Sequence, residues 1–401
     1  MSVRREIRVN ALIGTGHFLS HFYVLCMPTL FLAWQREFDV SFAQLGLTVA
    51  LMSGVTAILQ TPVGFLVDRY GARRFLVGGT LLMTLAIAGM GFATTFWQIL
   101  ALSILSGVGN SVIHPADYAI LAGSIDKSRM GRAFGIHTFN GNLGFAVAPP
   151  VMAFLTLALG WRESLMVVGG IGLPLVLTIL LQSRVLNDQG AAEHAETGPA
   201  ISGRALLMTK PMLLFFGFFM LASCAGAGLQ AWLITVLHQV KGMGLEAAST
   251  TLTFYMVGAT AGVLVGGYAA DRIKRHLTFA ATLTTFSAAL ILLVAALRLP
   301  DVAVIGLLFA SGLAVGASRT PRDVMLRDAA PPGQIGKVFG FVSSGLPLGN
   351  ALTPVPFGWL IDRGHPELVL VLVAAILLLS LMCAGTARVA AADSRPVLAS
   401  A

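Results

Sequence analysis

Long uncharged apolar runs restrict the fold of this chain more than any other feature. A helix needs roughly 20 apolar residues to cross a bilayer, and the sequence holds twelve runs of about that length. Only 11% of the residues are charged, against about 25% in a soluble protein. We therefore predict an all-α integral membrane protein with twelve transmembrane helices and no soluble domain. The runs lie at 10–33, 42–67, 75–93, 96–122, 133–159, 163–183, 212–237, 247–270, 277–297, 302–318, 338–360 and 366–387.

The distribution of basic residues predicts how the chain is oriented. The net charge of +8 is compatible with binding to nucleic acid, but the placement of the charges favours a membrane explanation. If the N-terminus is cytoplasmic, 21 of the 26 Lys and Arg residues fall in inner segments and 5 in outer loops, as the positive-inside rule requires. We expect a multi-pass protein of the cytoplasmic (inner) membrane, with both termini in the cytoplasm and no nucleic-acid partner.

A repeated stretch indicates two similar halves. The segment 106–150 occurs again at 311–354, and His114-Pro115-Ala116-Asp117 corresponds to Thr320-Pro321-Arg322-Asp323 at an offset of 206. One polar segment, 184–210, resembles a linker and separates six runs from six. We therefore predict two pseudo-symmetric six-helix bundles. The boundaries are 1–183 for the first bundle, 184–210 for a cytoplasmic linker, and 211–401 for the second bundle with its short cytoplasmic tail.

Two charged loops carry a common pattern, in which a glycine precedes an aspartate and a cluster of arginines. Such a turn can latch to neighbouring helix ends in one conformation and release in another. The first loop follows the second run and contains Gly64, Asp68, Arg69, Gly71, Arg73 and Arg74. Its counterpart after the eighth run contains Gly267, Asp271 and Arg272.

The first loop matches the signature of the major facilitator superfamily position for position, and with twelve runs and a central linker the whole chain resembles that family. The resemblance implies two halves that rock around a central cavity lined by spans 1, 4, 7 and 10. It also implies a cytoplasmic gate at the two charged loops and Asp323. Ser103 stands where drug–proton antiporters of the family carry an arginine. The cluster beginning at His114, followed by Gly-Arg-Ala-Phe-Gly, is most similar to the fosmidomycin-resistance type of efflux protein.

Ionisable residues inside the runs are costly and need a purpose. His17 and His21 share a helical face, as do His114 and Asp117, and His137 is found in the fifth run. Because histidine has an ordinary pKa near 6.5 and a carboxylate can tune it, these five residues are candidates for proton coupling. Asp117 has an alternative role at the cytoplasmic gate. No thiolate or carboxylate pair stands at a known ligand spacing, so we expect neither a metal nor a cofactor.

Other polar residues are candidates for substrate binding. Arginine suits a carboxylate or phosphate, so Arg319 and Arg322 indicate an anion site if they face the cavity. Alternatively, both lie at the inner surface and one pairs with Asp323 or Asp117. The remaining candidates could equally serve helix packing; they are Asn140, Gln230, Trp232, Tyr255 and Asn350.

The sequence favours a secondary active transporter. We expect it to move a small organic or drug-like solute by proton-coupled efflux, and we expect a monomer surrounded by lipid. The alternatives are uptake of a small organic anion, and a lipid flippase or sensor on the same scaffold. An enzyme is disfavoured because segment 333–338 lacks the Ser or Thr of a Walker A motif, and no zinc-protease motif or nucleophile elbow occurs.

Overall fold

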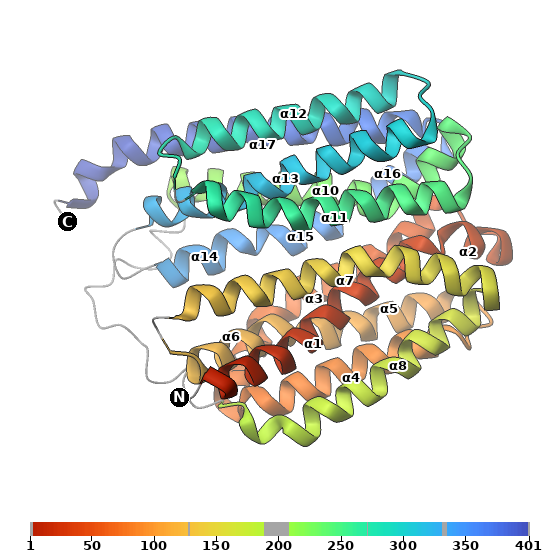
Figure 1. Ribbon diagram of the computed structural model, residues 1–401, viewed down its shortest axis with the longest axis horizontal. Coiled ribbons are helices and arrows are strands. Elements are labelled where there is room, and N and C mark those ends of the chain that lie inside the picture. The colour runs from red at the N-terminus through yellow and green to blue at the C-terminus, as the bar shows by residue number, and fades with distance from the viewer. Residues whose placement is uncertain (1–2, 127–128, 188–207, 271, 331–334, 400–401) are drawn as a thin grey trace. The chain divides into compact units, whose positions relative to one another are not determined.

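The computed structural model describes residues 3–126, 129–187, 208–270, 272–330 and 335–399 (Figure 1). The helices and one short 3-10 turn are the only regular elements among these residues. Asp271 and most of the predicted linker lie outside the described residues. The chain forms two units, Met1–Ala195 with Pro354–Asp362, and Glu196–Thr353 with Arg363–Ala401. The segment 354–362 thus packs with the first unit although its neighbours in the chain belong to the second.

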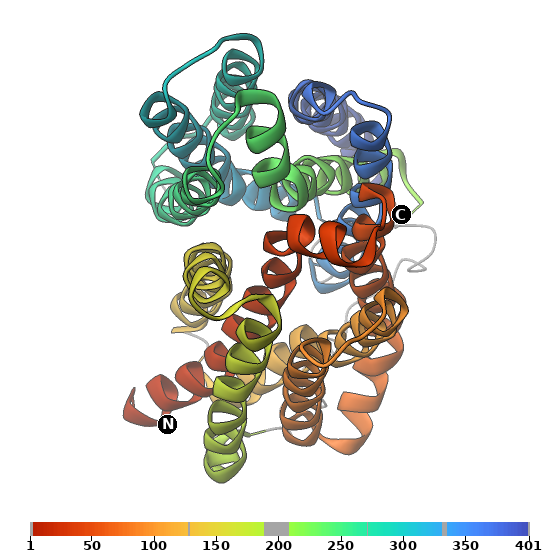
Figure 2. The same ribbon diagram turned by 90° about the vertical axis from the view of Figure 1, so that its right-hand side faces the viewer.

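The first unit consists of apolar helices joined by short turns. Figure 2 shows many of these helices nearly end-on. Gly71, with φ of +92°, makes the tight turn between α3 and α4, in a region that residues with a Cβ rarely adopt. The elements are α1 Val3–Thr29, α2 Phe31–Phe38, α3 Phe42–Tyr70, α4 Ala72–Met90, α5 Phe96–Asn110, α6 Ile113–Ser124, α7 Met130–Leu159, α8 Trp161–Gln182, the 3-10 turn Ser183–Val185 and α16 Pro354–Asp362.

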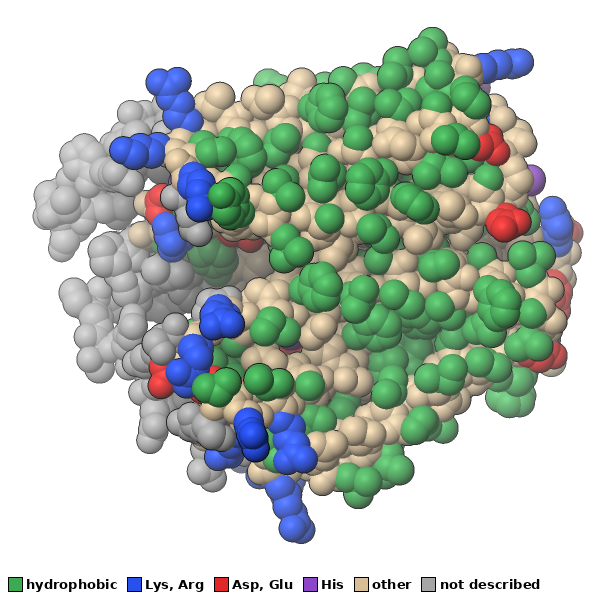
Figure 3. All heavy atoms as spheres, viewed as in Figure 1, with side chains coloured by type: hydrophobic (Ala, Val, Ile, Leu, Met, Phe, Trp, Pro, Cys, Tyr) green, Lys and Arg blue, Asp and Glu red, His purple; other side chains and the backbone are tan. Residues whose placement is uncertain are grey.

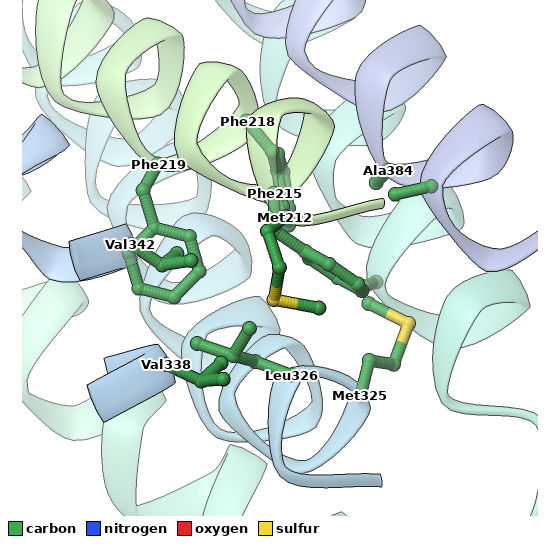
Figure 4. Close-up of a cluster of buried hydrophobic side chains, with 11 residues drawn as sticks. Met212, Phe215, Phe218, Phe219, Met325, Leu326, Val338, Val342 and Ala384 are labelled. Carbon is green, nitrogen blue, oxygen red and sulfur yellow. The ribbon is translucent and has the colours of Figure 1, made fainter. Parts of the chain in front are cut away.

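The second unit holds a buried hydrophobic cluster contributed by five of its helices (Figure 4). Phe215 and Phe219 of α10 lie in it beside Leu326 of α13 and Val338 and Val342 of α14. These side chains are almost completely shielded from solvent. Their contacts hold α10, α13 and α14 together at this cluster. The helices are α10 Lys210–Lys241, α11 Leu245–Ala270, α12 His276–Ala296, α13 Asp301–Ala329, α14 Ile335–Ser343, α15 Gly345–Leu352 and α17 Glu367–Ala399.

Most predicted runs correspond to one helix each, but the runs 10–33, 96–122 and 338–360 are interrupted. Among the described residues, ten helical segments are long and apolar enough to cross a membrane, and α1 with α2 forms an eleventh that bends by 49°. The run 338–360 is divided into α14, α15 and α16, each too short to cross alone. Pro354 begins α16 and Pro347 lies in the first turn of α15. Proline lacks an N–H and restricts the residue before it, so the breaks fall where prolines begin new segments.

The two copies of the repeat differ in which helix is interrupted. In the first copy, the helix breaks between α5 and α6, just before Pro115, while α7 continues through Pro149 and Pro150. In the second copy, α13 continues through Pro321, while the following run is broken into three. Similar sequences therefore produce one continuous and one interrupted helix in each copy, with their order exchanged.

Glycines set the closest helix contacts in the first unit. A Cβ on Gly144 of α7 would meet the backbone oxygen of Phe18 on α1. A Cβ on Gly46 of α3 would lie 2.6 Å from the backbone oxygen of Pro354 on α16. Small residues allow backbones to approach in this way within membranes, so α1 packs directly on α7, and α3 on α16.

Charged residues at helix ends make specific bonds. The backbone N–H groups of Phe42 and Ala43 donate to the two carboxylate oxygens of Asp362 at 2.7 and 2.9 Å, which satisfies donors that the first turn of α3 leaves unpaired. Arg129 donates to both carboxylate oxygens of Glu6 at 2.7 and 2.8 Å. This bond raises the pKa of Arg129. It ties the start of α1 to the start of α7.

The surface is divided by residue type. In Figure 3, Lys and Arg side chains gather mainly toward one end of the helices, and hydrophobic side chains cover their middle. Leu157, Phe154 and Leu181 are among the exposed apolar residues, at 70–77% of their full exposure. Such strongly exposed apolar side chains are expected where lipid rather than water surrounds the protein.

Candidate functional site

The five residues predicted for proton coupling lie together inside the first unit. His17 and His21 come from α1, His114 and Asp117 from α6, and His137 from α7. The break before α6 places His114 in its first turn and Asp117 one turn later. We call these five residues the histidine cluster.

The rings of the cluster are in direct contact. His17 stacks on His137 with centroids 3.9 Å apart and an interplanar angle of 13°. His17 also meets His21 and His114 edge-on, at centroid distances of 4.4 and 5.1 Å. His17 is therefore the centre of the cluster, and it contacts all three of the other imidazoles.

Asp117 faces this group rather than an arginine in the described residues. One of its carboxylate oxygens lies 3.7 Å from Nε2 of His137, which is longer than an ordinary hydrogen bond. Both residues are almost completely buried, at 0% and 1% exposure. The carboxylate of Asp117 therefore lies in the interior beside the imidazole of His137, close enough for both side chains to contact the same bound ion or molecule.

One backbone contact fixes the state of the central ring. Nδ1 of His17 lies 2.9 Å from the backbone oxygen of His137. A carbonyl oxygen can only accept a hydrogen bond, so Nδ1 carries the hydrogen. When the imidazole is neutral, Nε2 of His17 therefore presents a lone pair to the interior.

Several polar atoms of the cluster make no hydrogen bond within the described structure: Nε2 of His17, Nδ1 of His114, both oxygens of Asp117 and both ring nitrogens of His137. Buried polar groups are normally hydrogen-bonded, because leaving them unpaired costs free energy. A group of such atoms from three helices indicates a binding site rather than a packing interface.

The neighbouring contacts of α7 are tight. A Cβ on Gly141 would lie 2.6 Å from Cε1 of His17 and 2.9 Å from Cε1 of His21. Asn140, a predicted substrate residue, packs against Gly14 of α1, where an added Cβ would meet its amide group. Asn140 therefore belongs to the α1–α7 contact, one turn of α7 beyond His137.

The other predicted substrate residues lie in the second unit. Trp232 of α10 and Tyr255 of α11 are buried, at 0% and 4% exposure, and Gln230 of α10 is half-buried. Asn350 of α15 accepts a hydrogen bond of 2.9 Å from Ser223 of α10. The amide of Asn350 therefore takes part in helix packing.

The two arginines of α13 have different surroundings. Arg322 donates to Asp323 at 2.9 Å, and its guanidinium lies 4.0 Å from the ring centre of Phe219, one of the residues labelled in the hydrophobic cluster of Figure 4. Arg319 is half-buried one turn earlier, and it interacts electrostatically with Tyr255. Arg322 is thus held by its neighbours, whereas Arg319 is next to a buried phenol.

The predicted gate residues are described only in part. Arg69 lies 5.2 Å from the ring of Tyr70, and Arg272 lies 3.5 Å from the ring of Tyr268. The side chain of Asp68, like Asp271, lies outside the described residues. Gly64 is half-buried with a Cβ position 4.0 Å from Pro115, and Gly267 is half-buried with no heavy atom within 4 Å of its Cβ position. Arg73 is half-buried and Arg74 is exposed.

Sequence reasoning placed His17 with His21, and His114 with Asp117, on shared helical faces but did not bring the three helices together. The contact between His17 and His137 depends on α1 packing against α7. Glycines at 141 and 144 were the available signal, because residues three apart lie on one face of a helix. Pairing that face with α1 required the structure.

Comparison with known proteins agrees with this fold. A family model described as "Major Facilitator Superfamily" matches residues 13–262 and 245–398. The probable L-galactonate transporter of Escherichia coli K12 is 24% identical over 67% of this chain and 64% of its own length. That match covers less than two thirds of the relative.

A second relative matches nearly from end to end. The fosmidomycin resistance protein of Escherichia coli K12 is 24% identical over 94% of this chain and 92% of its own length. Among solved structures, a bacterial homologue of the human lysosomal transporter Spinster, described as inward-facing and unoccupied, has a TM-score of 0.80 at 14% identity. It covers 98% of this chain and 99% of that one. At this identity the structural likeness shows the fold alone, and the resemblance to the fosmidomycin-resistance type is confirmed at the level of sequence.

Proposed function

Because this chain belongs to the major facilitator superfamily, a family of multi-pass membrane transporters and not of enzymes, we propose that it exports a small organic or drug-like solute by alternating access. Secondary transporters draw their energy from an ion gradient. We propose that protons entering the cell supply it here.

The observation that carries the proposal is the histidine cluster. A bundle that only packs against lipid gains nothing from unpartnered imidazoles and a carboxylate in its interior. A bundle that handles a polar ligand needs groups that replace water around it. His17, Asp117 and His137 supply such groups from three different helices.

The end-to-end match to a resistance protein supports export over import. A resistance protein that transports acts by lowering the concentration of a compound inside the cell. We propose the direction of transport and the broad class of solute for this chain, whereas fosmidomycin belongs to the name of the relative.

The test is transport in proteoliposomes with an imposed pH gradient. Vesicles loaded with a panel of antibacterials and small organic anions are followed for solute movement and, with a pH-sensitive dye, for proton movement. We expect at least one compound to move against the direction of the protons, and a protonophore to abolish its movement. If no compound of the panel moves in exchange for protons, the proposal fails.

Uptake of a small organic anion is a second candidate, favoured by Arg319. This residue is half-buried on α13 and interacts with Tyr255, and arginine binds carboxylates well. The relative named for L-galactonate, which is a carboxylate, lends it support. We expect Arg319→Ala to abolish anion accumulation, whereas Arg327→Ala, at an exposed residue paired with Asp328, leaves it unchanged. Equal loss in both variants would count against an anion site at Arg319.

A further inference from the structure

The histidine cluster has the composition of a metal site. It contains four imidazoles and one carboxylate, and one candidate ligand atom each from His17, Asp117 and His137 lie within 4.8 Å of one another. His17, His21 and His114 meet the same condition. His17, Asp117 and His137 lie on three different helices, so spacing within a single helix gave no indication of this group.

We propose that the first unit binds one divalent transition-metal ion of the Zn²⁺ class between α1, α6 and α7, with His17, Asp117 and His137 as its ligands. This proposal goes beyond solute export and does not depend on it. His114 lies next to the three ligands, with centroids 5.1 Å from His17, and is placed to supply a fourth ligand.

The chemistry of the ligands selects the class of ion. Imidazole nitrogen with one carboxylate oxygen is a common donor set for Zn²⁺ and for related ions such as Co²⁺ and Ni²⁺. Ca²⁺ and Mg²⁺ prefer shells composed of oxygen atoms, which this cluster does not offer. The single carboxylate of Asp117 offsets part of the ion's charge, which a buried site requires.

The central ring already has the orientation of a metal ligand. Metal-binding histidines usually donate their second ring N–H to a carbonyl or carboxylate, which orients the ring. Nδ1 of His17 makes such a bond to the backbone of His137 at 2.9 Å, and Nε2 has no hydrogen-bond partner. The lone pair of Nε2 is therefore available to a cation.

Only modest movements separate this arrangement from a bound one. With Zn–N distances of about 2.0–2.1 Å, tetrahedral ligands lie about 3.3 Å apart, so the candidate atoms need to approach by at most about 1.5 Å. The rings of His17 and His137 are parallel, and one of them must turn so that both lone pairs point at the ion. Neither ring nitrogen of His137 makes a hydrogen bond, so this ring can turn without breaking one.

The experiment measures binding of Zn²⁺ alone to tag-free full-length protein in detergent after treatment with a chelator. Calorimetry and elemental analysis give the affinity and the number of ions per chain. We expect one Zn²⁺ per chain, and visible absorption from bound Co²⁺ in place of Zn²⁺. His17→Gln and Asp117→Asn should each weaken binding by at least about tenfold.

The matched control is His365→Gln, because His365 is exposed and belongs to the second unit. It should bind Zn²⁺ as the unaltered protein does. Each variant is compared by its elution volume in gel filtration, and at the same concentration Zn²⁺ should raise the melting temperature of the unaltered protein more than that of a folded His17→Gln variant.

The proposal is overturned if the unaltered protein binds no Zn²⁺, or if His17→Gln and Asp117→Asn bind it as tightly as His365→Gln does. The measurement uses neither solute nor gradient. A negative result therefore leaves solute export standing, and transport in chelator-treated vesicles tests that function separately.

Discussion

Replacing Gly141 by alanine tests how the histidine cluster is held. A Cβ at this position would lie 2.6 Å from Cε1 and 2.9 Å from Nε2 of His17, and 2.9 Å from Cε1 of His21. Contacts this short force a movement, and both neighbours are side chains of the same face of α1. Gly141→Ala should therefore push the two imidazoles away from α7.

The size of the effect follows from two opposing contributions. Overpacking a filled interior costs about 1–3 kcal/mol, whereas exchanging glycine for alanine within a helix gains up to about 1 kcal/mol. Gly135 of the same helix has no heavy atom within 4 Å of its Cβ position. Gly135→Ala should therefore gain helix stability without overpacking the interior. The two variants should differ by about 1–3 kcal/mol in the free energy of unfolding.

Thermal unfolding in detergent measures this difference. The first unit has a size within the range of 150–250 residues. For a cooperative unit of that size, 1 kcal/mol shifts the melting temperature by about 2–4 °C, so Gly141→Ala should melt about 2–12 °C below Gly135→Ala. His17→Ala should cost less in the Gly141→Ala background than in the unaltered protein, because it removes the colliding ring. A Gly141→Ala variant as stable as Gly135→Ala would falsify the close contact.

Two further predictions concern polar contacts. Asp362→Ala removes both acceptors for the N–H groups of Phe42 and Ala43 and should lower stability by about 0.5–2 kcal/mol, whereas an unchanged melting temperature would show that the bonds contribute nothing. Ser287 and Ser311 form a buried hydrogen bond of 2.7 Å between α12 and α13; Ser287→Ala should cost about 1–3 kcal/mol, and the double alanine variant less than the sum of both single ones. Additive losses in chemical denaturation would contradict this coupling.

The sequence specified the class of the fold but not the continuity of its helices. Uncharged runs predicted the spans because lipid offers no partner to backbone groups, so apolar length is a direct signal. Proline is a weaker one. Pro321 lies inside the unbroken α13, whereas α5 ends five residues before Pro115 and a new helix, α6, contains that proline. The packing around each proline decides whether the lost hydrogen bond breaks the helix.

The candidate site was predictable in its members but not in its assembly. Helical periodicity placed His17 with His21 and His114 with Asp117, because residues three or four apart share a face. The stacking of His17 on His137 and the approach of Asp117 to His137 depend on contacts between helices. Local sequence does not encode which faces meet, so the possibility of shared coordination emerged only from the three-dimensional arrangement.

The exchanged order of continuous and interrupted helices places the interruption at a different helix in each copy of the repeat. The interruption in the first copy lies at 111–112, between α5 and α6, directly beside His114. That of the second lies at 344 and 353, on either side of α15. The duplicated sequence has thus placed a helix interruption beside the histidine cluster in the first copy, whereas the matching helix of the second copy, α13, is continuous.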